Sequence, residues 1–450
     1  MTPKLSPHSK STFAQIFFLL LAFIIVTGLA TTSVAGKTNH AITTLEYTID
    51  RTAVPELNYT DLTLIINVSD ATAIDVKNGE NVSIPYKSGP AADEITLTTT
   101  SNRVIVTIDG MTNLTSVGGF RKANLKDNYA WAYSHGFDDN FALDNERQIF
   151  LDRNIPATFN VVSEWVEENQ FWEGDFSPAE FAEIVDAGWD INNHTSDHET
   201  GDGQSNGCSD TLTRAERKAD VLAAQAQLES HLANTSRPDY KIIGFAIPCG
   251  GSAQWADYPG IIHEIRDNNE ADLLYYEGGQ GSPVYMTVNP PFDLNRDILR
   301  DGRIDGSGAQ SIFITNTFDS ISSQTQQSGT PIWYTTLSHG EIIFGNNETA
   351  LAETIDYLIN NYGSNGTNEV WIAGTATVYS YLLVRDKSVV TQLQGPELTV
   401  TPTSMATSEP TATTTPTLPP TITPTETLAA TQEPSENDVF IYLPFTMTGN

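Results

Sequence analysis

From about residue 126 onward, short apolar segments alternate with amphipathic ones, and this alternation constrains the fold more than any other feature. Eight segments have the composition of strands: Ala130–Phe137, Ala157–Val162, Trp189–Asn192, Ile242–Ile247, Leu273–Tyr276, Ser311–Thr315, Ile332–Leu337 and Val370–Ala373. Helical periodicity is clearest between them at Thr211–Asn234 and Ala350–Tyr362. Alternating strands and helices predict an α/β fold with parallel strands. Roughly seven or eight such repeats would close a distorted (β/α) barrel.

The regions on either side of this segment have different compositions. Residues 40–118 contain short strand-like runs separated by turn signals such as Asn78-Gly79, which predicts an all-β sandwich domain. Such a domain can bind carbohydrate or act as a spacer, and the spacer is favoured because its sequence contains no evident ligand site. Residues 396–436 are rich in Thr and Pro and predict an extended linker. The apolar tail at 437–450 is too short to span a bilayer and is either a docking tail for a cell surface or a frayed end.

The N-terminus has the pattern of an export signal. Lys4 and Lys10 precede an uncharged apolar run from Phe13 to Ala30, and a small-x-small cleavage site ends at Ala35. Residues 1–35 are therefore predicted to be a signal peptide, although the apolar run is long enough to leave an uncleaved anchor as the alternative. Either way, we expect the protein to be secreted or held at the cell surface.

Charge and cysteine content narrow the possible partners. The chain of 450 residues carries 56 acidic and 23 basic side chains, a net charge of −33. Nucleic acid is not expected as a partner, because two polyanions repel one another. The two cysteines, Cys208 and Cys249, could pair in an oxidising compartment or remain as buried thiols.

Two distant fragments supply the ligands of a metal site. Asp138-Asp139 is the only Asp-Asp pair in the chain, and His194 and His198 are the only histidines spaced four apart. On a helical turn, that spacing would bring the two imidazoles together. One carboxylate and two imidazoles make a sufficient set of protein ligands for a catalytic divalent ion and leave a position open for water. The second Asp would then be available as a base.

The candidate residues fall at the same ends of different predicted strands. Asp138-Asp139, His194, Cys249 and His339 each follow one of the strand-like segments. In an α/β barrel, chemistry gathers at the carboxyl ends of the strands, so we expect these residues to lie close together. His339 is a candidate general acid, since an imidazole can donate a proton near neutral pH. His135 lies within a strand and is predicted to be a packed structural histidine.

At this point a family resemblance becomes visible in five motifs. In chain order they are Phe137–Asp139, Ile155–Phe159, Asn193–His198, Phe245–Gly250 and Leu337–His339. Together they make residues 126–395 resemble a polysaccharide deacetylase of the NodB-homology type, carbohydrate esterase family 4. Some positions depart from the pattern. His135-Gly136 replaces the usual apolar-hydroxyl pair, and Asn140 replaces Gly. An Arg often found in the fourth of these motifs is absent at Ala246, with Arg296 as a candidate replacement, and Cys249 stands where an aromatic residue often lines the substrate groove.

The resemblance implies a distorted (β/α) barrel of the NodB type and a divalent metal ion, commonly Zn²⁺. Carried onto this chain, Asp139, His194 and His198 would hold the metal. Asp138 would be the general base, His339 the general acid, and the backbone N–H of Cys249 a donor to the oxyanion.

The implied function is hydrolysis of N-acetyl groups on an amino-sugar polymer by an exported, metal-dependent enzyme. Two alternatives stay open from the sequence. One is an O-acetyl esterase of the xylan type, and the other is a catalytically inactive surface protein that binds carbohydrate.

Overall fold

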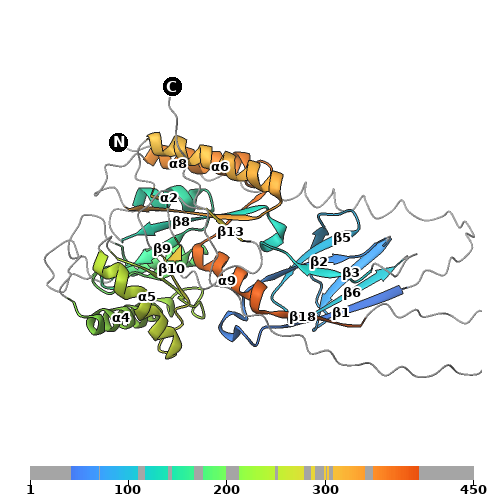
Figure 1. Ribbon diagram of the computed structural model, residues 1–450, viewed down its shortest axis with the longest axis horizontal. Coiled ribbons are helices and arrows are strands. Elements are labelled where there is room, and N and C mark those ends of the chain that lie inside the picture. The colour runs from blue at the N-terminus through green and yellow to red at the C-terminus, as the bar shows by residue number, and fades with distance from the viewer. Residues whose placement is uncertain are drawn as a thin grey trace, which may run out of the picture. The chain divides into compact units, whose positions relative to one another are not determined.

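The computed structural model describes twelve stretches of the chain (Figure 1). They are residues 42–69, 71–109, 117–139, 144–166, 176–198, 212–248, 252–277, 285–288, 298–299, 302–303, 308–339 and 348–394. The predicted signal peptide, both cysteines, Arg296, the Thr/Pro-rich linker and the apolar tail lie outside these residues. No helix within the described stretches is long and apolar enough to cross a membrane.

Two antiparallel sheets form the N-terminal region. The first has the order β18-β1-β6-β3, with β18 at Val389–Gln394, β1 at Ile42–Asp50, β6 at Arg103–Asp109 and β3 at Ala73–Asn78. The second has the order β4-β5-β2-β7, with β4 at Tyr86–Ser88, β5 at Glu94–Thr99, β2 at Leu62–Asn67 and β7 at Phe120–Lys122. In β6, buried residues alternate with more exposed ones, as expected for a strand with one face on a core. The all-β character predicted for this region is confirmed.

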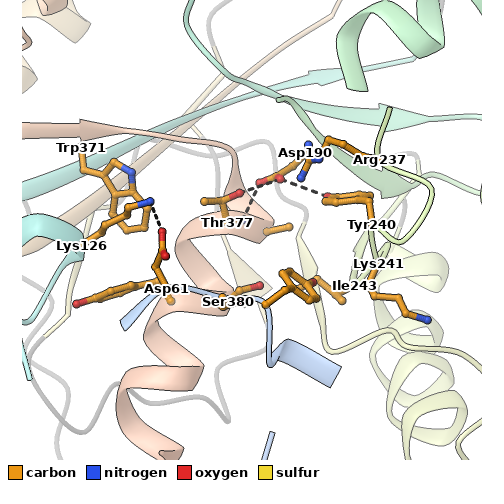
Figure 2. A pocket seen from close by; sticks show the side chains of 14 residues that line it. Asp61, Lys126, Asp190, Arg237, Tyr240, Lys241, Ile243, Trp371, Thr377 and Ser380 are labelled. Carbon is orange, nitrogen blue, oxygen red and sulfur yellow. Dashed lines mark hydrogen bonds and ion pairs between the residues drawn. The ribbon is translucent and has the colours of Figure 1, made fainter. Parts of the chain in front are cut away.

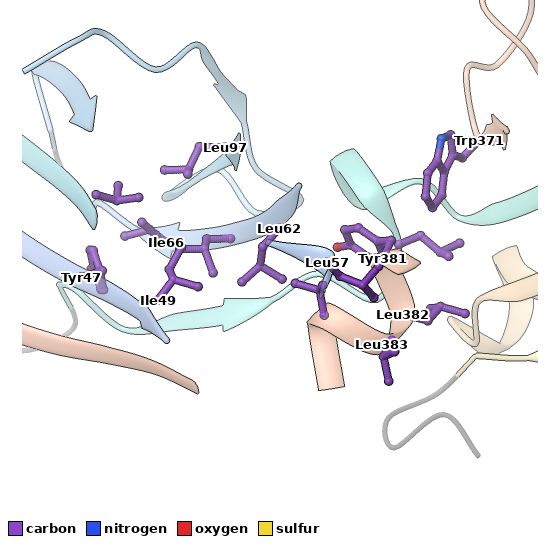
Figure 3. Close-up of a cluster of buried hydrophobic side chains, with 14 of the residues drawn as sticks. Tyr47, Ile49, Leu57, Leu62, Ile66, Leu97, Trp371, Tyr381, Leu382 and Leu383 are labelled. Atoms are coloured by element: carbon purple, nitrogen blue, oxygen red, sulfur yellow. The ribbon is translucent and has the colours of Figure 1, made fainter. Parts of the chain in front are cut away.

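One hydrophobic core joins these sheets to the region that follows. It contains residues of both sheets, such as Tyr47 and Leu97, together with Trp371 of β17 (Val370–Ile372) and Tyr381 of α9 (Thr375–Lys387) (Figure 3). The Tyr381 hydroxyl also donates a hydrogen bond of 2.9 Å to the carbonyl of Ala123. After α9 the chain returns as β18 and pairs antiparallel with β1, although its residues lie within the 126–395 range assigned to the α/β segment.

The α/β region is built on a sheet of ten strands. Its main path is β13-β16-β8-β9-β10-β11-β12-β14, while β15 pairs with β16 and β17 pairs with β8. The strands are β8 at Trp131–Asp138, β9 at Thr158–Val161, β10 at Asp190–Asn193, β11 at Gly244–Ala246, β12 at Tyr275–Glu277, β13 at Tyr285–Thr287, β14 at Ile298–Leu299, β15 at Gly302–Arg303 and β16 at Ile332–His339. All pairs are parallel except β13 with β16. The predicted α/β fold is confirmed, and the pairings of the described strands run as an open path.

Helices connect the parallel strands. They are α2 at Asp144–Asp152, α3 at Pro178–Asp186, α4 at Arg214–Leu232, α5 at Ser252–Asp267, α6 at Gly308–Ser328 and α8 at Glu348–Asn361. Of the 3₁₀ turns, η1 at Pro55–Leu57 follows β1, η2 at Lys126–Asn128 precedes β8, and η3 at Ser163–Val166 follows β9. Figure 1 shows α6 and α8 side by side and α9 between the parallel sheet and the N-terminal strands. Helix α4 begins with a capping box between Thr213 and Glu216, which satisfies two backbone donors at its first turn.

The predicted strand Ser311–Thr315 is wrong, because these residues lie inside α6. An apolar run of this length fits either a buried strand or a buried helix. The longer pattern decides the structure: Ile314, Phe318 and Ile321 are buried at the three- and four-residue spacing of one helix face.

His135 is a packed strand histidine, as predicted. Its Nδ1 lies 2.8 Å from the hydroxyl of Thr336 and its Nε2 lies 3.0 Å from that of Ser338, and its ring stacks on Phe150. Complete burial disfavours the charged imidazolium and lowers the pKa of His135 to about 3.

This low pKa predicts acid sensitivity of the fold. Unfolded His135 would bind a proton near pH 6.5, whereas the folded chain would bind it only near pH 3. Between these values stability should therefore fall by about 1.4 kcal/mol per pH unit as the pH drops. His135→Gln should fall less steeply than wild type from pH 6.5 to pH 4 in urea unfolding. An unchanged slope in the His135→Gln protein would contradict this interpretation.

Candidate active site

The parallel strands align four polar residues in one row. His339 at the end of β16 is in register with Asp138 at the end of β8. Asp138 is in register with Asn160 of β9, which is in register with Asn192 of β10. Asp138, Asn160 and Asn192, which are in register on neighbouring parallel strands, therefore point to the same face of the sheet. The strand ends therefore bring Asp138 and the backbone of His339 to one place, as the sequence predicted.

Asp139, His194 and His198 converge directly beyond these strand ends. The Nε2 atoms of His194 and His198 lie 3.4 Å and 3.3 Å from Oδ1 of Asp139, and the three possible ligand atoms lie within 4.8 Å of one another. Asp139 is 4% exposed and His194 is 2% exposed. Asp139 has a positive φ of 65°, so the chain turns sharply as β8 ends. These are the three residues predicted to hold the metal.

The hydrogen bonds of His194 fit a metal ligand. Its Nδ1 lies 3.0 Å from the carbonyl oxygen of Ala246, which can only accept, so Nδ1 carries the proton. Nε2 is then left to face Asp139 and His198, as in metal-ligating histidines whose other nitrogen donates to a carbonyl. One carboxylate and two imidazole nitrogens suit Zn²⁺ and similar divalent ions. The residues present therefore fit the implied metal.

Burial and the neighbouring negative charges have opposite effects on the pKa of His194. Burial disfavours the imidazolium, but the hydrogen bond to Asp139 and the negative charges of Asp138 and Asp139 favour it, and the net effect raises the pKa of His194. A metal ligand must be a neutral imidazole, so binding of a cation at this site would displace a proton.

The two histidines lie on a loop, and the predicted helical turn at His194–His198 is wrong. Thr195 and His198 have positive φ angles of 70° and 59°, which a right-handed helix does not contain. Local hydrogen bonds hold the loop instead. The N–H of Thr195 donates to Asn193 Oδ1, the N–H of His198 donates to Thr195 Oγ1, and the N–H of Ser196 donates to Asp220 Oδ1. The hydroxyl of Thr195 thus fixes the backbone of the second histidine.

Buried amides hold the candidate base. Asn160 Nδ2 donates a hydrogen bond of 2.5 Å to Asp138 Oδ1. Asn192 Nδ2 in turn donates to Asn160 Oδ1 at 3.0 Å and to Glu277 Oε1 at 2.5 Å. A chain of hydrogen bonds therefore runs from the base across three neighbouring strands to a buried carboxylate on β12. The negative charge at Asp138 is stabilised by a neutral amide at this point.

Asn160, Asn192 and Glu277 were not predicted as site residues from the sequence. The available signal was a polar residue inside an apolar strand segment, because buried polar groups need partners and cluster where the fold supplies them. Gly244 also belongs to this arrangement. A Cβ there would meet Asn192 Oδ1 at 2.0 Å and the Tyr275 hydroxyl at 2.4 Å, so only glycine leaves room for the hydrogen bond between those two side chains.

Among the remaining predicted site residues, the structure describes only the backbone of His339. His339 is the last residue of β16, and its backbone is in register with Asp138. Cys249 and Arg296 lie outside the described residues.

Comparisons with known proteins agree with the motifs. Residues 137–256 match the family described as polysaccharide deacetylase. Comparison with curated proteins gave no match. Among solved structures, the peptidoglycan deacetylase PdaC from Bacillus subtilis is 15% identical, covers 58% of this chain and 95% of its own, and has a TM-score of 0.32.

Two further structures show similar values. A family 4 acetyl xylan esterase from Clostridium thermocellum, in complex with a cobalt ion, is 14% identical, covers 55% of this chain and 90% of its own, and has a TM-score of 0.30. A CE4 family pseudoenzyme mutant with restored activity is 14% identical, covers 60% of this chain and 80% of its own, and has a TM-score of 0.33.

The cluster of Asp139, His194 and His198 predicts which substitutions weaken metal binding. Asp139→Ala and His194→Ala should each weaken Zn²⁺ binding at least about a hundredfold, because each removes one of three protein ligands. Zinc titration of purified protein, with competition against a chelator, measures this. Asp138→Asn is the matched control one residue away and should retain zinc; equal loss in all three variants would contradict the assignment of Asp139 as the ligand.

Proposed function

We propose that this chain, in which residues 137–256 match the polysaccharide deacetylase family, is an exported, metal-dependent hydrolase that removes N-acetyl groups from an amino-sugar polymer. The observation that carries the proposal is the convergence of Asp139, His194 and His198 beside Asp138 at the carboxyl ends of β8 and β10. Export rests on the signal pattern in residues 1–35.

The proposed chemistry assigns one task to each group. A divalent ion such as Zn²⁺, held by Asp139, His194 and His198, would act as a Lewis acid toward the acetyl group and lower the pKa of bound water. Asp138 would accept the proton of the attacking water, and Asn160 holds its carboxylate in place for this step. The backbone N–H of Cys249 would donate to the developing oxyanion.

Whether the proposed enzyme can hydrolyse an amide as well as an ester depends on its general acid. An amine is a poor leaving group unless it is protonated, so amide hydrolysis needs a proton donor at the departing nitrogen. His339 is the proposed donor, because β16 ends next to the end of β8. Hydrolysis of O-acetyl groups, as on acetylated xylan, is the second candidate and would depend less on this residue.

Acetate release tests the proposal directly. The mature protein, loaded with zinc, should release acetate from N-acetylated glucosamine oligomers. Asp138→Asn should reduce the rate by about 10²–10⁴-fold, because an amide cannot take the proton. His339→Gln should slow the oligomers more than an activated ester such as 4-nitrophenyl acetate. Release from acetylated xylan alone would favour the esterase, and zinc binding without any acetate release would favour an inactive binding protein.

The hydrogen bond from Asn160 predicts a positioning role for that residue. Asn160→Ala removes the donor that holds the carboxylate of Asp138, so kcat/KM for acetate release should fall by about tenfold to a hundredfold because the proposed base is no longer fixed. Asn365→Ala, at an exposed loop position, should leave kcat/KM unchanged. A wild-type kcat/KM in the Asn160→Ala protein would contradict this role.

A further inference from the structure

The loop that carries His194 and His198 has a backbone conformation that needs support from its neighbours. Thr195 and His198 have positive φ angles of 70° and 59°, a region that side chains, and β-branched ones above all, rarely adopt. Backbone strain of this kind persists only where the surrounding structure fixes it. The contacts that fix this loop therefore decide whether the two imidazoles stay close enough to bind one ion.

The strand that leads into the loop is fixed at its start. Asp190, the first residue of β10, accepts hydrogen bonds of 2.7 Å and 2.9 Å from the N–H and the hydroxyl of Thr377 and one of 3.3 Å from the hydroxyl of Tyr240 (Figure 2). Just beyond the end of β10, the N–H of His194 donates to the carbonyl of Val161 on β9 at 3.0 Å. The sheet therefore fixes the chain as far as the first histidine.

Beyond His194, the turn η3 binds two carbonyl groups of the loop. The N–H of Ser163 donates to the carbonyl of Thr195 at 3.1 Å. The N–H of Glu164 donates to the carbonyl of Ser196 at 3.0 Å. These bonds use the acceptors of the loop, so its N–H donors need partners elsewhere.

Helix α4 supplies the acceptor for Ser196. Asp220 Oδ1 accepts a hydrogen bond of 3.1 Å from the N–H of Ser196 and a second one from its hydroxyl. The N–H groups of Thr195 and His198 bond to side chains of their own segment, whereas that of Ser196 bonds to a different element. Ser196 is buried, so removal of Asp220 would leave two donors away from bulk water without this acceptor.

Helix α4 is a fixed support for this contact. Its residues Val221, Ala224 and Leu228 are buried in the protein interior. Asn193, the residue before the first histidine, donates from Nδ2 to the carbonyl of Val221 at 2.9 Å. The helix therefore contacts the segment both before the first histidine, at Asn193, and after it, at Ser196.

We propose that Asp220 is a positioning residue of the metal site, because through Ser196 it keeps His198 in place. Nε2 of His198 lies 3.3 Å from Oδ1 of Asp139. The side chain of His198 is 14% exposed and that of His194 is 2% exposed, so the second imidazole is less enclosed by packing. Its position therefore depends more on the loop backbone. The proposal rests on the metal site of the proposed function and not on the identity of the substrate.

Zinc affinity tests the proposal without any substrate. Asp220→Ala removes the acceptor, so zinc binding by the purified protein, measured in competition with a chelator, should weaken by about tenfold to a hundredfold. Asp220→Asn keeps a carbonyl oxygen for the N–H of Ser196 and should recover most of this loss.

A double-mutant cycle shows whether the effect passes through His198. His198→Ala alone removes a proposed ligand and should weaken zinc binding. Adding Asp220→Ala to that variant should weaken binding further by no more than about twofold, because the imidazole that Asp220 positions is already absent.

Glu264→Ala is the matched control. Glu264 on α5 pairs with Arg214 and Lys218 of α4 at 2.8 Å and 2.7 Å, so its loss removes a negative charge and contacts of the same helix that do not involve Asp220. Zinc affinity should be unchanged in this variant. Thermal unfolding shows whether each variant is folded. If Asp220→Ala is not, Ser196→Ala removes the hydroxyl half of the contact and should also weaken zinc binding.

Three outcomes would overturn the proposal and leave the metal site intact. They are wild-type zinc affinity in the Asp220→Ala protein, an equal loss with and without His198, and an equal loss in Asp220→Asn and Asp220→Ala. The last would mean that the charge of Asp220 matters and its hydrogen bond does not. Absence of zinc binding by the unsubstituted protein would instead overturn the metal site, and with it both this proposal and the proposed function.

Discussion

The register of the parallel strands is the constraint on which the site depends. Pairing of β16, β8, β9 and β10 sets the backbone of His339 beside Asp138, Asp138 beside Asn160, and Asn160 beside Asn192. Side chains alternate between the two faces of a strand, so a slip of one residue would turn Asp138 away from its partners. The proposed ligands Asp139 and His194 follow directly after β8 and β10, and the same register therefore places the candidate metal site.

Polar side chains inside this sheet are stable only because each finds a partner. A buried donor or acceptor left without one costs about 1–3 kcal/mol. Asn192 bonds to Asn160, Glu277 and Tyr275 together, and Gly244 leaves the space in which it does so. The candidate base Asp138 is thus held through Asn160 by a network of amides that extends to Glu277.

Much of this arrangement could be predicted from the sequence, and the failures have physical causes. Strand ends were located because apolar runs of four to eight residues followed by polar residues are distinctive. Ser311–Thr315 failed because a short apolar run does not distinguish a strand from a helix. The loop at Thr195–His198 failed because spacing alone cannot reveal positive φ angles. Asn160 and Glu277 were missed because their partners lie on strands far apart in the sequence, and only the sheet order brings them together.

The N-terminal sheets also do more than the spacer function favoured from the sequence. A spacer joined by few contacts could be removed without exposing a core, but here one hydrophobic cluster includes Leu64 of β2 and Tyr381 of α9. Helix α9 is capped by Asp190 at the start of β10, the strand whose far end leads into His194. Loss of the sheets would expose the apolar face of α9, and α9 in turn packs against β8 and β10. The sheets therefore stabilise the strands that position Asp138 and His194, although they contribute none of the proposed catalytic groups.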